Sequence, residues 1–438
     1  MRARCLAAGT LNLALALALF AQSKPVIALK AARLLDGKSA TELTNAVVLV
    51  ESGKIKSVGS ALPIPAGAKV IDLGDRTLLP GLIDVHTHLL SEMDGTNLTL
   101  QDVEMLRIVA TQSTAERALL GAKLAKEMLE SGITTVRDLG NSGVNGDVAL
   151  HRAIERGWLP GPRMIVSTRA LAAAGGQFGP LTPEAQPIIE REYVTLHGAE
   201  SSRQAVRQAL YDGAGCIKVI VNGSPAPVTL AELQAIVEEA HANHVKVAAH
   251  AIGDYATRTA VEAGVDSIEH AYVVPDDVLK KMAEKHIYLV PTDGTLRTFV
   301  EMSIGTRQAS AEERRALENQ FRGHVQQSQE RLRRAIHYGV PIAAGSDMYL
   351  SMPQLNRGQA SLLVYDAYSE AGMTPTDIIQ AATSGAAELL GIAAAVGTLE
   401  PGKVADIIAV PGDAGKSVNA LEHASFVMQS GSVIKKQD

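Results

Sequence analysis

The sequence is poor in cysteine, in aromatic residues and in long runs of one charge. It contains only Cys5 and Cys216 among 438 residues, which excludes a disulfide framework as the source of stability. Aromatic residues make up 3% of the chain while small and aliphatic residues are abundant, a composition that favours strands buried under helices over an exposed all-β fold. The net charge of −6 comes from interspersed charges of both signs. It gives no reason to expect nucleic acid or an anionic membrane, so we expect a small-molecule partner.

The first 21 residues have the pattern of a secretory signal. Arg2 and Arg4 precede an apolar run from Leu6 to Ala21, which at about 16 residues is short for a membrane span. We therefore expect residues 1–21 to be removed on export to the periplasm or the exterior, leaving a mature form outside the membrane. Export would leave Cys216 as the only cysteine, in a packing role.

From Pro80 onward, brief β-branched segments alternate with longer segments of helical period, which is typical of repeated βα units. Good helical segments are Thr114–Glu130, Leu230–Asn243 and Ala311–His337. We expect residues 81–390 to form an α/β fold, a (β/α)8 TIM barrel. Its eight predicted strands are Leu82–His86, Ile133–Asp138, Arg163–Ser167, Cys216–Val221, Lys246–His250, Asp266–His270, Ile287–Pro291 and Pro341–Asp347.

The two ends of the chain resemble each other and differ from the middle. Both carry short apolar pieces separated by Gly, Ser, Pro and Asp, which predicts antiparallel strands. We expect residues 22–80 and 391–438 to pair into one small β-sandwich domain. The predicted strands are Ala46–Val50, Lys54–Val58, Lys69–Asp72, Gly397–Gly402, Ala405–Val410 and Ser425–Val433.

The first predicted barrel strand ends in His86-Thr87-His88. A spacing of two residues on a strand places both imidazoles on the same side, where they can share one ion. Lys218 lies inside the apolar segment Cys216–Val221, where an unpaired ammonium would be costly. We therefore expect this lysine to have a chemical role in the site.

Three further candidates also fall at the carboxyl ends of predicted strands, which form the functional face of a barrel. They are His250, His270 and Asp347. The remaining histidines, except His197, lie on predicted helices, at a strand start or in the last segment, where surface or core roles suffice. The sequence thus predicts a metal centre of four histidines, one lysine and one aspartate.

These residues resemble the amidohydrolase superfamily, whose binuclear members use them in this strand order. The resemblance extends to Gly132–Asp138, His250-Ala251-x-Gly253, Glu269-His270, Gly345-Ser346-Asp347 and Gly397–Asp406. It implies that His86, His88 and Asp347 bind one divalent ion, that His250 and His270 bind a second, and that carboxylated Lys218 bridges both. Nitrogen and carboxylate-type ligands suit zinc best. Asp347 is then the expected catalytic group, taking the proton of the attacking water and passing it to the leaving amine.

The resemblance is strongest to the prolidase-like and imidazolonepropionase-like branch, some of whose members hydrolyse ochratoxin A. It implies an amide hydrolase that releases a C-terminal amino acid from an N-acyl amino acid or dipeptide, and a homo-oligomer up to the octamer. We expect substrate contacts from Gln177, His197 and Asn222. Gln177 stands where many relatives have histidine, and Asn222 lies in a segment that departs from the relatives' glycine-rich form.

Three alternatives stay open. The same metal pair could attack lactones or cyclic amides. Lys218 could instead act as a Schiff-base nucleophile in an aldolase-like barrel, a reading that leaves the other five ligands unused. A non-catalytic exported binding protein is the third, because a fold alone does not prove catalysis.

Overall fold

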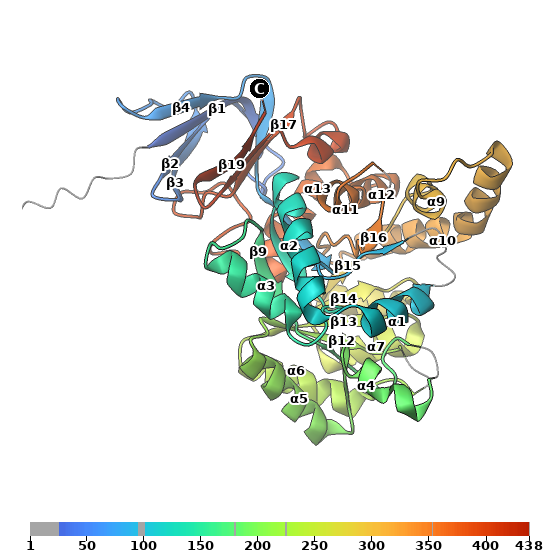
Figure 1. The fold of residues 1–438 in the computed structure, drawn as a ribbon. Coiled ribbons are helices and arrows are strands. Elements are labelled where there is room, and N and C mark those ends of the chain that lie inside the picture. Colours follow the sequence, from blue (N-terminus) through green and yellow to red (C-terminus); the bar gives the residue numbers. More distant parts are fainter. Residues whose placement is uncertain (1–25, 95–100, 179–180, 224–225, 353, 438) are drawn as a thin grey trace, which may run out of the picture.

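The structure is a computed structural model that describes residues 26–94, 101–178, 181–223, 226–352 and 354–437 (Figure 1). The predicted signal segment 1–21 lies outside these ranges. Figure 1 shows a β-rich part built from both ends of the chain, above a larger part in which strands and helices alternate. Within the described ranges, no helix combines the length and apolarity needed to cross a bilayer.

The two ends of the chain share one eight-stranded sheet in the order β19-β18-β17-β5-β1-β2-β3, with β4 paired to β1. Ile55 N donates to Lys403 O at 2.9 Å, so the edge strand β3 lies beside the segment that leads to β17. The strands are β1 Ile27–Leu34, β2 Leu43–Glu51, β3 Lys54–Ser60, β4 Lys69–Asp72, β5 Arg76–Pro80, β17 Ile407–Pro411, β18 Phe426–Gln429 and β19 Ser432–Lys436.

Three expectations for this sheet were wrong. The segment Ser425–Val433, expected as one strand, contains a turn at residues 430–431 that separates the antiparallel strands β18 and β19. The pairing is mixed rather than antiparallel, because β1 runs parallel to both β4 and β5. The predicted strand Gly397–Gly402 is a series of turns, since Gly397 and Gly402 adopt φ of +91° and +92°, a left-handed conformation outside the strand region. Side chains from both chain ends, among them Leu29 and Phe426, nevertheless form one buried apolar cluster.

The middle of the chain contains two parallel sheets. The three-stranded sheet has the order β6-β8-β9 and the six-stranded sheet has the order β11-β10-β12-β13-β14-β15. The strands are β6 Leu82–Thr87, β8 Ile133–Asp138, β9 Arg163–Val166, β10 Ala170–Ala172, β11 Tyr193–Thr195, β12 Cys216–Ile220, β13 Lys246–Ala251, β14 Ser267–His270 and β15 Tyr288–Val290; a separate pair is β7 Met93–Asp94 with β16 Leu350–Ser351.

The predicted eighth strand, Pro341–Asp347, is not a regular strand. Only an isolated bridge joins Ile342 to Leu289, and Ser346 N donates to the Asp84 side chain at 3.0 Å instead of to a neighbouring backbone. The segment still connects the two sheets, because Ala343 N donates to Leu289 O and Val85 N donates to Ala344 O.

Helices alternate with the parallel strands as expected. Capping boxes fix the starts of five of the described helices, each satisfying two otherwise free backbone donors. The pairs are Ser113 with Glu116, Thr229 with Glu232, Ser310 with Glu313, Asn356 with Gln359, and Thr374 with Asp377. The helices are α1 Gln101–Thr111, α2 Thr114–Glu130, α3 Gly146–Glu155, α4 Gln186–Ile189, α5 Ala199–Asp212, α6 Leu230–Ala242, α7 Asp254–Ala263, α8 Asp276–Glu284, α9 Leu296–Ile304, α10 Ala311–His337, α11 Arg357–Leu362, α12 Val364–Glu370, α13 Pro375–Ala381 and α14 Ser384–Leu389.

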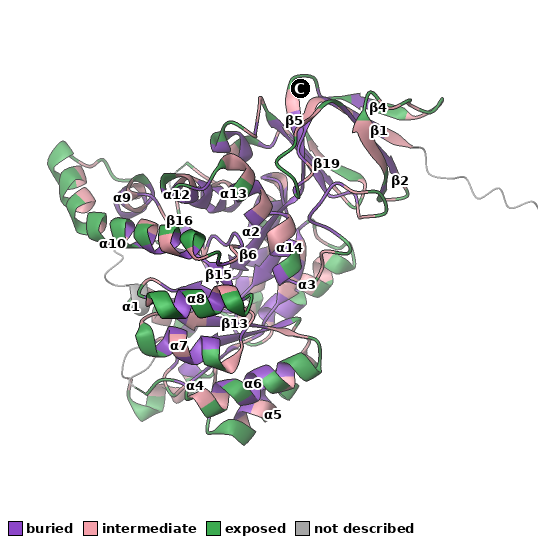
Figure 2. Cartoon of the chain, turned by 180° about the vertical axis from the view of Figure 1, so that it is seen from behind, coloured by how far each residue is buried: buried purple, intermediate pink, exposed green. Residues whose placement is uncertain are grey.

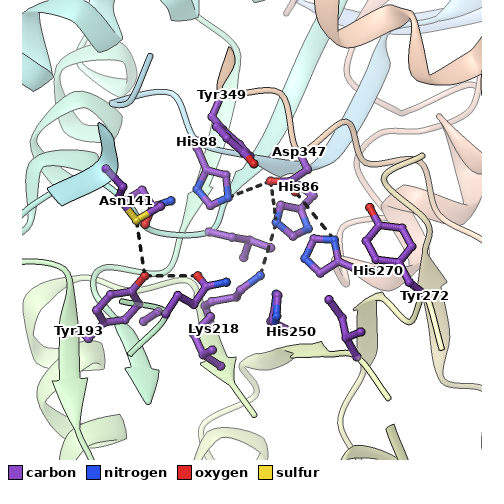
Figure 3. Close-up of a pocket in the computed structure, with 16 residues that line it drawn as sticks. His86, His88, Asn141, Tyr193, Lys218, His250, His270, Tyr272, Asp347 and Tyr349 are labelled. Atoms are coloured by element: carbon purple, nitrogen blue, oxygen red, sulfur yellow. Dashed lines mark hydrogen bonds and ion pairs between the residues drawn. The ribbon is translucent and has the colours of Figure 1, made fainter. Parts of the chain in front are cut away.

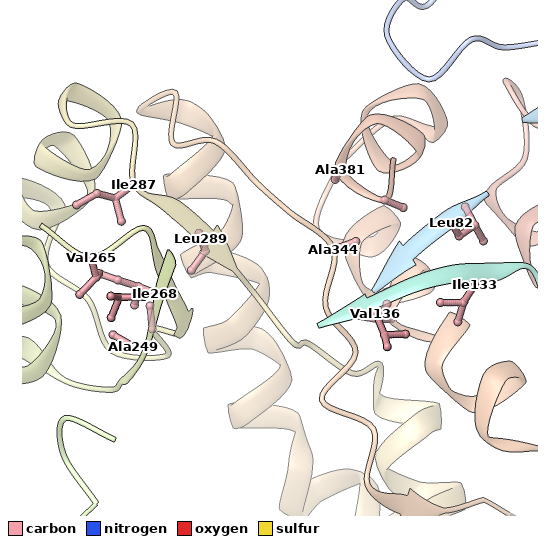
Figure 4. Close-up of a cluster of buried hydrophobic side chains, with 14 of the residues drawn as sticks. Leu82, Ile133, Val136, Ala249, Val265, Ile268, Ile287, Leu289, Ala344 and Ala381 are labelled. Carbon is pink, nitrogen blue, oxygen red and sulfur yellow. The ribbon is translucent and has the colours of Figure 1, made fainter. Parts of the chain in front are cut away.

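The main apolar core spans both parallel sheets. Leu82 and Val136 from one sheet and Ile268 and Leu289 from the other belong to the same buried cluster, with Ala344 between them (Figure 4). Figure 2 shows that buried residues fill the centre and that exposed residues lie on the outer faces of the helices. Each fully buried Leu or Ile contributes about 1.5–3 kcal/mol, so this core holds the strand ends in a fixed arrangement.

Candidate metal centre

The candidate site lies where the parallel strands end (Figure 3). His86 is near the end of β6 and His88 follows it, and both side chains are buried. His86 Nδ1 donates to Glu269 Oε2 at 2.6 Å and His88 Nδ1 donates to Gly140 O at 2.9 Å. Since both Nδ1 atoms carry protons, both Nε2 atoms are left with a free lone pair, as metal ligation requires.

Asp347 faces both of these Nε2 atoms. Its Oδ1 lies 3.2 Å from His88 Nε2 and 3.5 Å from His86 Nε2. Ligand atoms of the three residues lie within 4.8 Å of one another, which is a spacing that one ion can bridge. Gly345 makes this approach possible, because a side chain there would meet His86 Cβ at 2.7 Å.

The remaining predicted ligands surround the same space. Lys218 Nζ, on β12, lies 3.4 Å from His86 Nε2. The ring centroids of His250 and His270 are 4.7 Å apart, and those of His86 and His270 are 5.1 Å apart. All six residues predicted as metal ligands thus converge from five separate segments of the chain.

His270 is oriented by the strand next to it. Thr292 Oγ1 donates to Pro291 O at 2.7 Å and therefore accepts from His270 Nδ1 at 2.7 Å. Residues His270, Thr292 and Asp347 have φ of +69°, +56° and +50°. Such values are uncommon outside glycine and concentrate at functional sites, so the backbone here is shaped by the site rather than by strand geometry.

A buried ion pair supports His86 from behind. Arg137 Nη2 donates to Glu269 Oε1 at 2.8 Å, Arg137 Nε donates to Val85 O at 2.6 Å, and both side chains are inaccessible to solvent. Although burial opposes ionisation, Arg137 and His86 lower the pKa of Glu269 to about 2. The Glu269 carboxylate is therefore a permanent acceptor for His86. From sequence, Glu269 was identified only as part of the Glu269-His270 motif. Its position next to His270 on the same strand was the feature that could have indicated a role at the site.

The protonation states suit a metal site. Burial, followed by the charge of Lys218, lowers the pKa of His86 to about 4 and that of His250 to about 3. Burial also lowers the pKa of Lys218 to about 8. Neutral imidazoles are the ligand form of histidine, and a neutral amine is the form of lysine that can react with carbon dioxide.

A cavity of about 210 Å³ opens over these residues. Gln177 lines it and accepts from Tyr193 Oη at 3.3 Å. Asn222 and His197 are not among its lining residues: Asn222 Oδ1 accepts from Ile252 N at 2.9 Å, and His197 is exposed before α5. Asn141, Tyr272 and Tyr349, which the sequence analysis did not single out, complete the wall (Figure 3).

Comparison with known proteins agrees with this arrangement. The model of the amidohydrolase family matches residues 77–436. Ochratoxinase from Aspergillus niger is 30% identical over 401 residues, covering 84% of this chain and 78% of that protein. Imidazolonepropionase from Geobacillus kaustophilus is 26% identical over 430 residues, covering 90% of each chain.

Solved structures give the same result. A Xaa-Pro dipeptidase with methionine bound in its active site has a TM-score of 0.78 and 29% identity, with 93% of this chain and 99% of that chain covered. The structure of A. niger ochratoxinase has a TM-score of 0.76 and 26% identity, with 94% and 96% covered. The match therefore includes both the terminal sheet and the parallel part.

Proposed function

The chain belongs to the amidohydrolase family and is a hydrolase, and from this premise we propose that it releases a C-terminal amino acid from an N-acyl amino acid or a dipeptide. The convergence of six potential ligands on one cavity carries this proposal. The relatives support the substrate class: a Xaa-Pro dipeptidase acts on a dipeptide, and the name ochratoxinase points to ochratoxin. Cleavage of ochratoxin A to ochratoxin alpha and phenylalanine is a specific form of the same reaction.

The donor set fits two divalent ions, most simply Zn²⁺. We propose His86, His88 and Asp347 as ligands of one ion, His250 and His270 as ligands of the other, and carboxylated Lys218 as the bridge. The fit is chemical: the free Nε2 atoms of His86 and His88 face an aspartate, and Lys218 is 3% exposed with its amine beside an imidazole. A carboxylated lysine supplies the anionic oxygens that an ammonium lacks.

When bound, such ions polarise a substrate carbonyl and make a water molecule a stronger nucleophile. The protein's own residues then have distinct tasks. Asp347 takes the proton of the attacking water and delivers it to the leaving nitrogen. Although burial acts in the opposite sense, positive groups around the site, Lys218 among them, lower the pKa of Asp347, so it enters the reaction as the carboxylate. Glu269 and Arg137 hold the His86 ring, and Gln177 offers an amide to the substrate.

The test is mass spectrometry of products from the zinc-loaded protein and a panel of N-acyl amino acids, Xaa-Pro dipeptides, ochratoxin A and lactones. We expect a free C-terminal amino acid, loss of turnover after chelation, and recovery with zinc. His88→Asn should abolish turnover, and the exposed His337→Asn serves as its matched control. Turnover that survives complete metal removal would overturn the proposal.

A lactonase or cyclic amidase is the second candidate. It is favoured by the similarity to imidazolonepropionase, and the same pair of ions can attack a ring ester or amide. Cleavage of lactones or cyclic amides alone, with no release of amino acid from the linear substrates, would replace the first proposal by this one and leave the metal centre unchanged.

Four further properties complete the proposal. We propose that the two parallel sheets and residues 341–347 together make a closed (β/α)8 barrel over residues 81–390, and that residues 22–80 and 391–438 form a β-sandwich. The two backbone hydrogen bonds that connect β15 to β6 through this segment support the first of these. We also propose export after cleavage near residue 21 and assembly into a homo-oligomer up to the octamer. Mass spectrometry of the secreted protein tests export and cleavage, and light scattering tests the oligomeric state.

A further inference from the structure

A second cavity, of about 210 Å³, adjoins the one above the metal ligands. Tyr272, Asp347 and Tyr349 line both cavities; Figure 3 shows the two tyrosines flanking Asp347. The wall of the second cavity is mixed, with Phe299 and Met302 from α9 on one part and Asp293 and His324 on another. A group attached next to Asp347 can therefore extend out of the reaction site along the apolar part of this wall.

A third cavity, of about 630 Å³, borders the second, since Thr298 and Leu363 line both. It lies where α9 turns into α10, and Figure 1 shows these helices on the side of the molecule away from the terminal sheet. The stacked rings of Phe299 and Phe321, with centroids 5.3 Å apart, pack α9 against α10. Three cavities, each sharing lining residues with the next, thus lie between the proposed metal ligands and the α9–α10 turn.

The third cavity is rich in hydrogen-bond donors. Arg297, Arg307 and Arg314 line it, the first two with exposed side chains, whereas Glu301 is the only carboxylate among the lining residues that the structure describes. Arg314 pairs with Glu301 at 2.7 Å and Arg297 lies 3.6 Å from Asp366, which is outside the cavity. Arg307 donates to Ser303 O at 3.0 Å, and among the described residues no carboxylate lies within 4.0 Å of its guanidinium.

We propose that this third cavity is a subsite for an oxyanion at the tip of the leaving amino acid's side chain, with Arg307 as its principal contact. The proposal rests on the proposed function and narrows its substrate class. Asp347 delivers the proton to the leaving nitrogen and also lines the second cavity, so the leaving group is the part of the substrate that faces this route. The apolar middle of the side chain occupies the second cavity, and its anionic end reaches the arginines. Guanidinium groups bind planar oxyanions through paired N–H donors.

The test compares three substrates with one scissile bond: N-benzoyl-phenylalanine, N-benzoyl-4-carboxyphenylalanine and N-benzoyl-4-carbamoylphenylalanine. The last two have the same shape and differ in charge. We expect kcat/KM to favour the carboxylate over the carboxamide by about tenfold to a hundredfold, as expected for a hydrogen bond to a charged group. Arg307→Gln should reduce this ratio to near one. Arg315→Gln, which changes an exposed neighbour that does not line the cavity, should leave it unaltered.

Equal turnover of the carboxylate and carboxamide by the unaltered enzyme would overturn the subsite, as would a preference that persists in Arg307→Gln. Calorimetric titration with free 4-carboxyphenylalanine and its carboxamide gives a readout that needs no turnover. If none of the three substrates is cleaved, the proposed function fails. The subsite then stands if the carboxylate binds more tightly through Arg307, and falls if both compounds bind equally.

Discussion

His86 Nδ1 and Glu269 Oε2 lie 2.6 Å apart although the two residues are separated by 183 positions in the chain. The carboxylate fixes which nitrogen of the imidazole carries the proton, and it is itself held by Arg137 at 2.8 Å. Strands β6, β8 and β14 each contribute one member of this group. The orientation of a proposed metal ligand is therefore built into the packing of three parallel strands.

Glu269→Gln should weaken metal binding about 10- to 100-fold, because residues that orient a ligand affect affinity nearly as much as the ligand does. The amide keeps the size of the side chain but loses the charge that holds the His86 proton. The measurement is the zinc content of the protein after equilibration with a series of metal buffers. Glu284→Gln, an exposed position on α8, is the control. An unaltered zinc affinity would show that Glu269 does not act through His86.

Arg137→Met should destabilise the fold by about 3–5 kcal/mol, because it leaves the Glu269 charge buried without its partner. Arg137 also donates to Val85 O and to Ser267 Oγ, and these acceptors lose their donor as well. Urea denaturation of the metal-free protein measures the change. Combining Arg137→Met with Glu269→Gln removes the unpaired charge, so the double variant should recover part of the loss; a fully additive result would contradict the pairing.

Lys218→Met should reduce turnover by at least about a hundredfold and lower the metal content from two ions to one per chain, because methionine cannot supply a bridging carboxylate. The mass of the intact unaltered protein under non-acidic conditions should exceed the sequence mass by one carbon dioxide. Lys280→Met, on the surface helix α8, is the matched control. Full activity in Lys218→Met would exclude the bridge and would also exclude a Schiff-base role for this lysine.

Much of the candidate site could be predicted from sequence because most of the proposed ligands lie on or directly after an apolar strand, and parallel strands end on the same side of the fold. Residues far apart in the chain, such as His86 and Lys218, are therefore close in space. The regular strand predicted at Pro341–Asp347 was wrong because Ser346 N bonds to the Asp84 side chain. No local pattern in the sequence marks such a partner.

Apart from Gln177, the residues that line the cavities could not be predicted, because their position depends on how distant segments pack together. Tyr272 and Tyr349 reach the site from loops after β14 and before β16, and Arg307 faces a cavity that exists only where α9, α10 and the segment near Leu355 pack together. His197, expected from sequence to contact the substrate, is exposed and does not line the cavity.

Asp347→Asn should lower kcat by about 10²- to 10⁴-fold, because an amide cannot accept the proton of the attacking water or deliver it to the leaving nitrogen. The loss should be smaller for an activated anilide, which leaves without needing a proton. Comparing kcat for an alkyl amide and a nitroanilide in both proteins separates proton delivery from metal binding. An equal loss for both substrates, with reduced zinc content, would make Asp347 a ligand only.

Asp147 gives the fold a pH dependence away from the metal centre. Its carboxylate accepts from Thr168 N at 2.8 Å and from Val148 N at 2.9 Å, but burial, followed by the charge of Asp138, raises its pKa from 3.8 to about 7. The folded state therefore holds a proton that the unfolded state releases between about pH 4 and 7. Across this range the contribution of Asp147 to the free energy of unfolding must fall as pH rises, and it levels off above about pH 7.

Asp147→Asn removes this titration. The variant loses hydrogen-bond strength at every pH, which changes its free energy of unfolding by a constant. The informative quantity is therefore how the difference in free energy of unfolding between the two proteins varies with pH. The unaltered protein should lose on the order of 3 kcal/mol relative to the variant between pH 4 and pH 8, since one pKa unit corresponds to about 1.4 kcal/mol. Urea denaturation at pH 4.5, 6 and 8 measures this difference, and the titrations of the metal ligands cancel because both proteins share them. A flat difference for Asp147→Asn would mean that Asp147 is ionised throughout, with its two backbone donors outweighing the cost of burial.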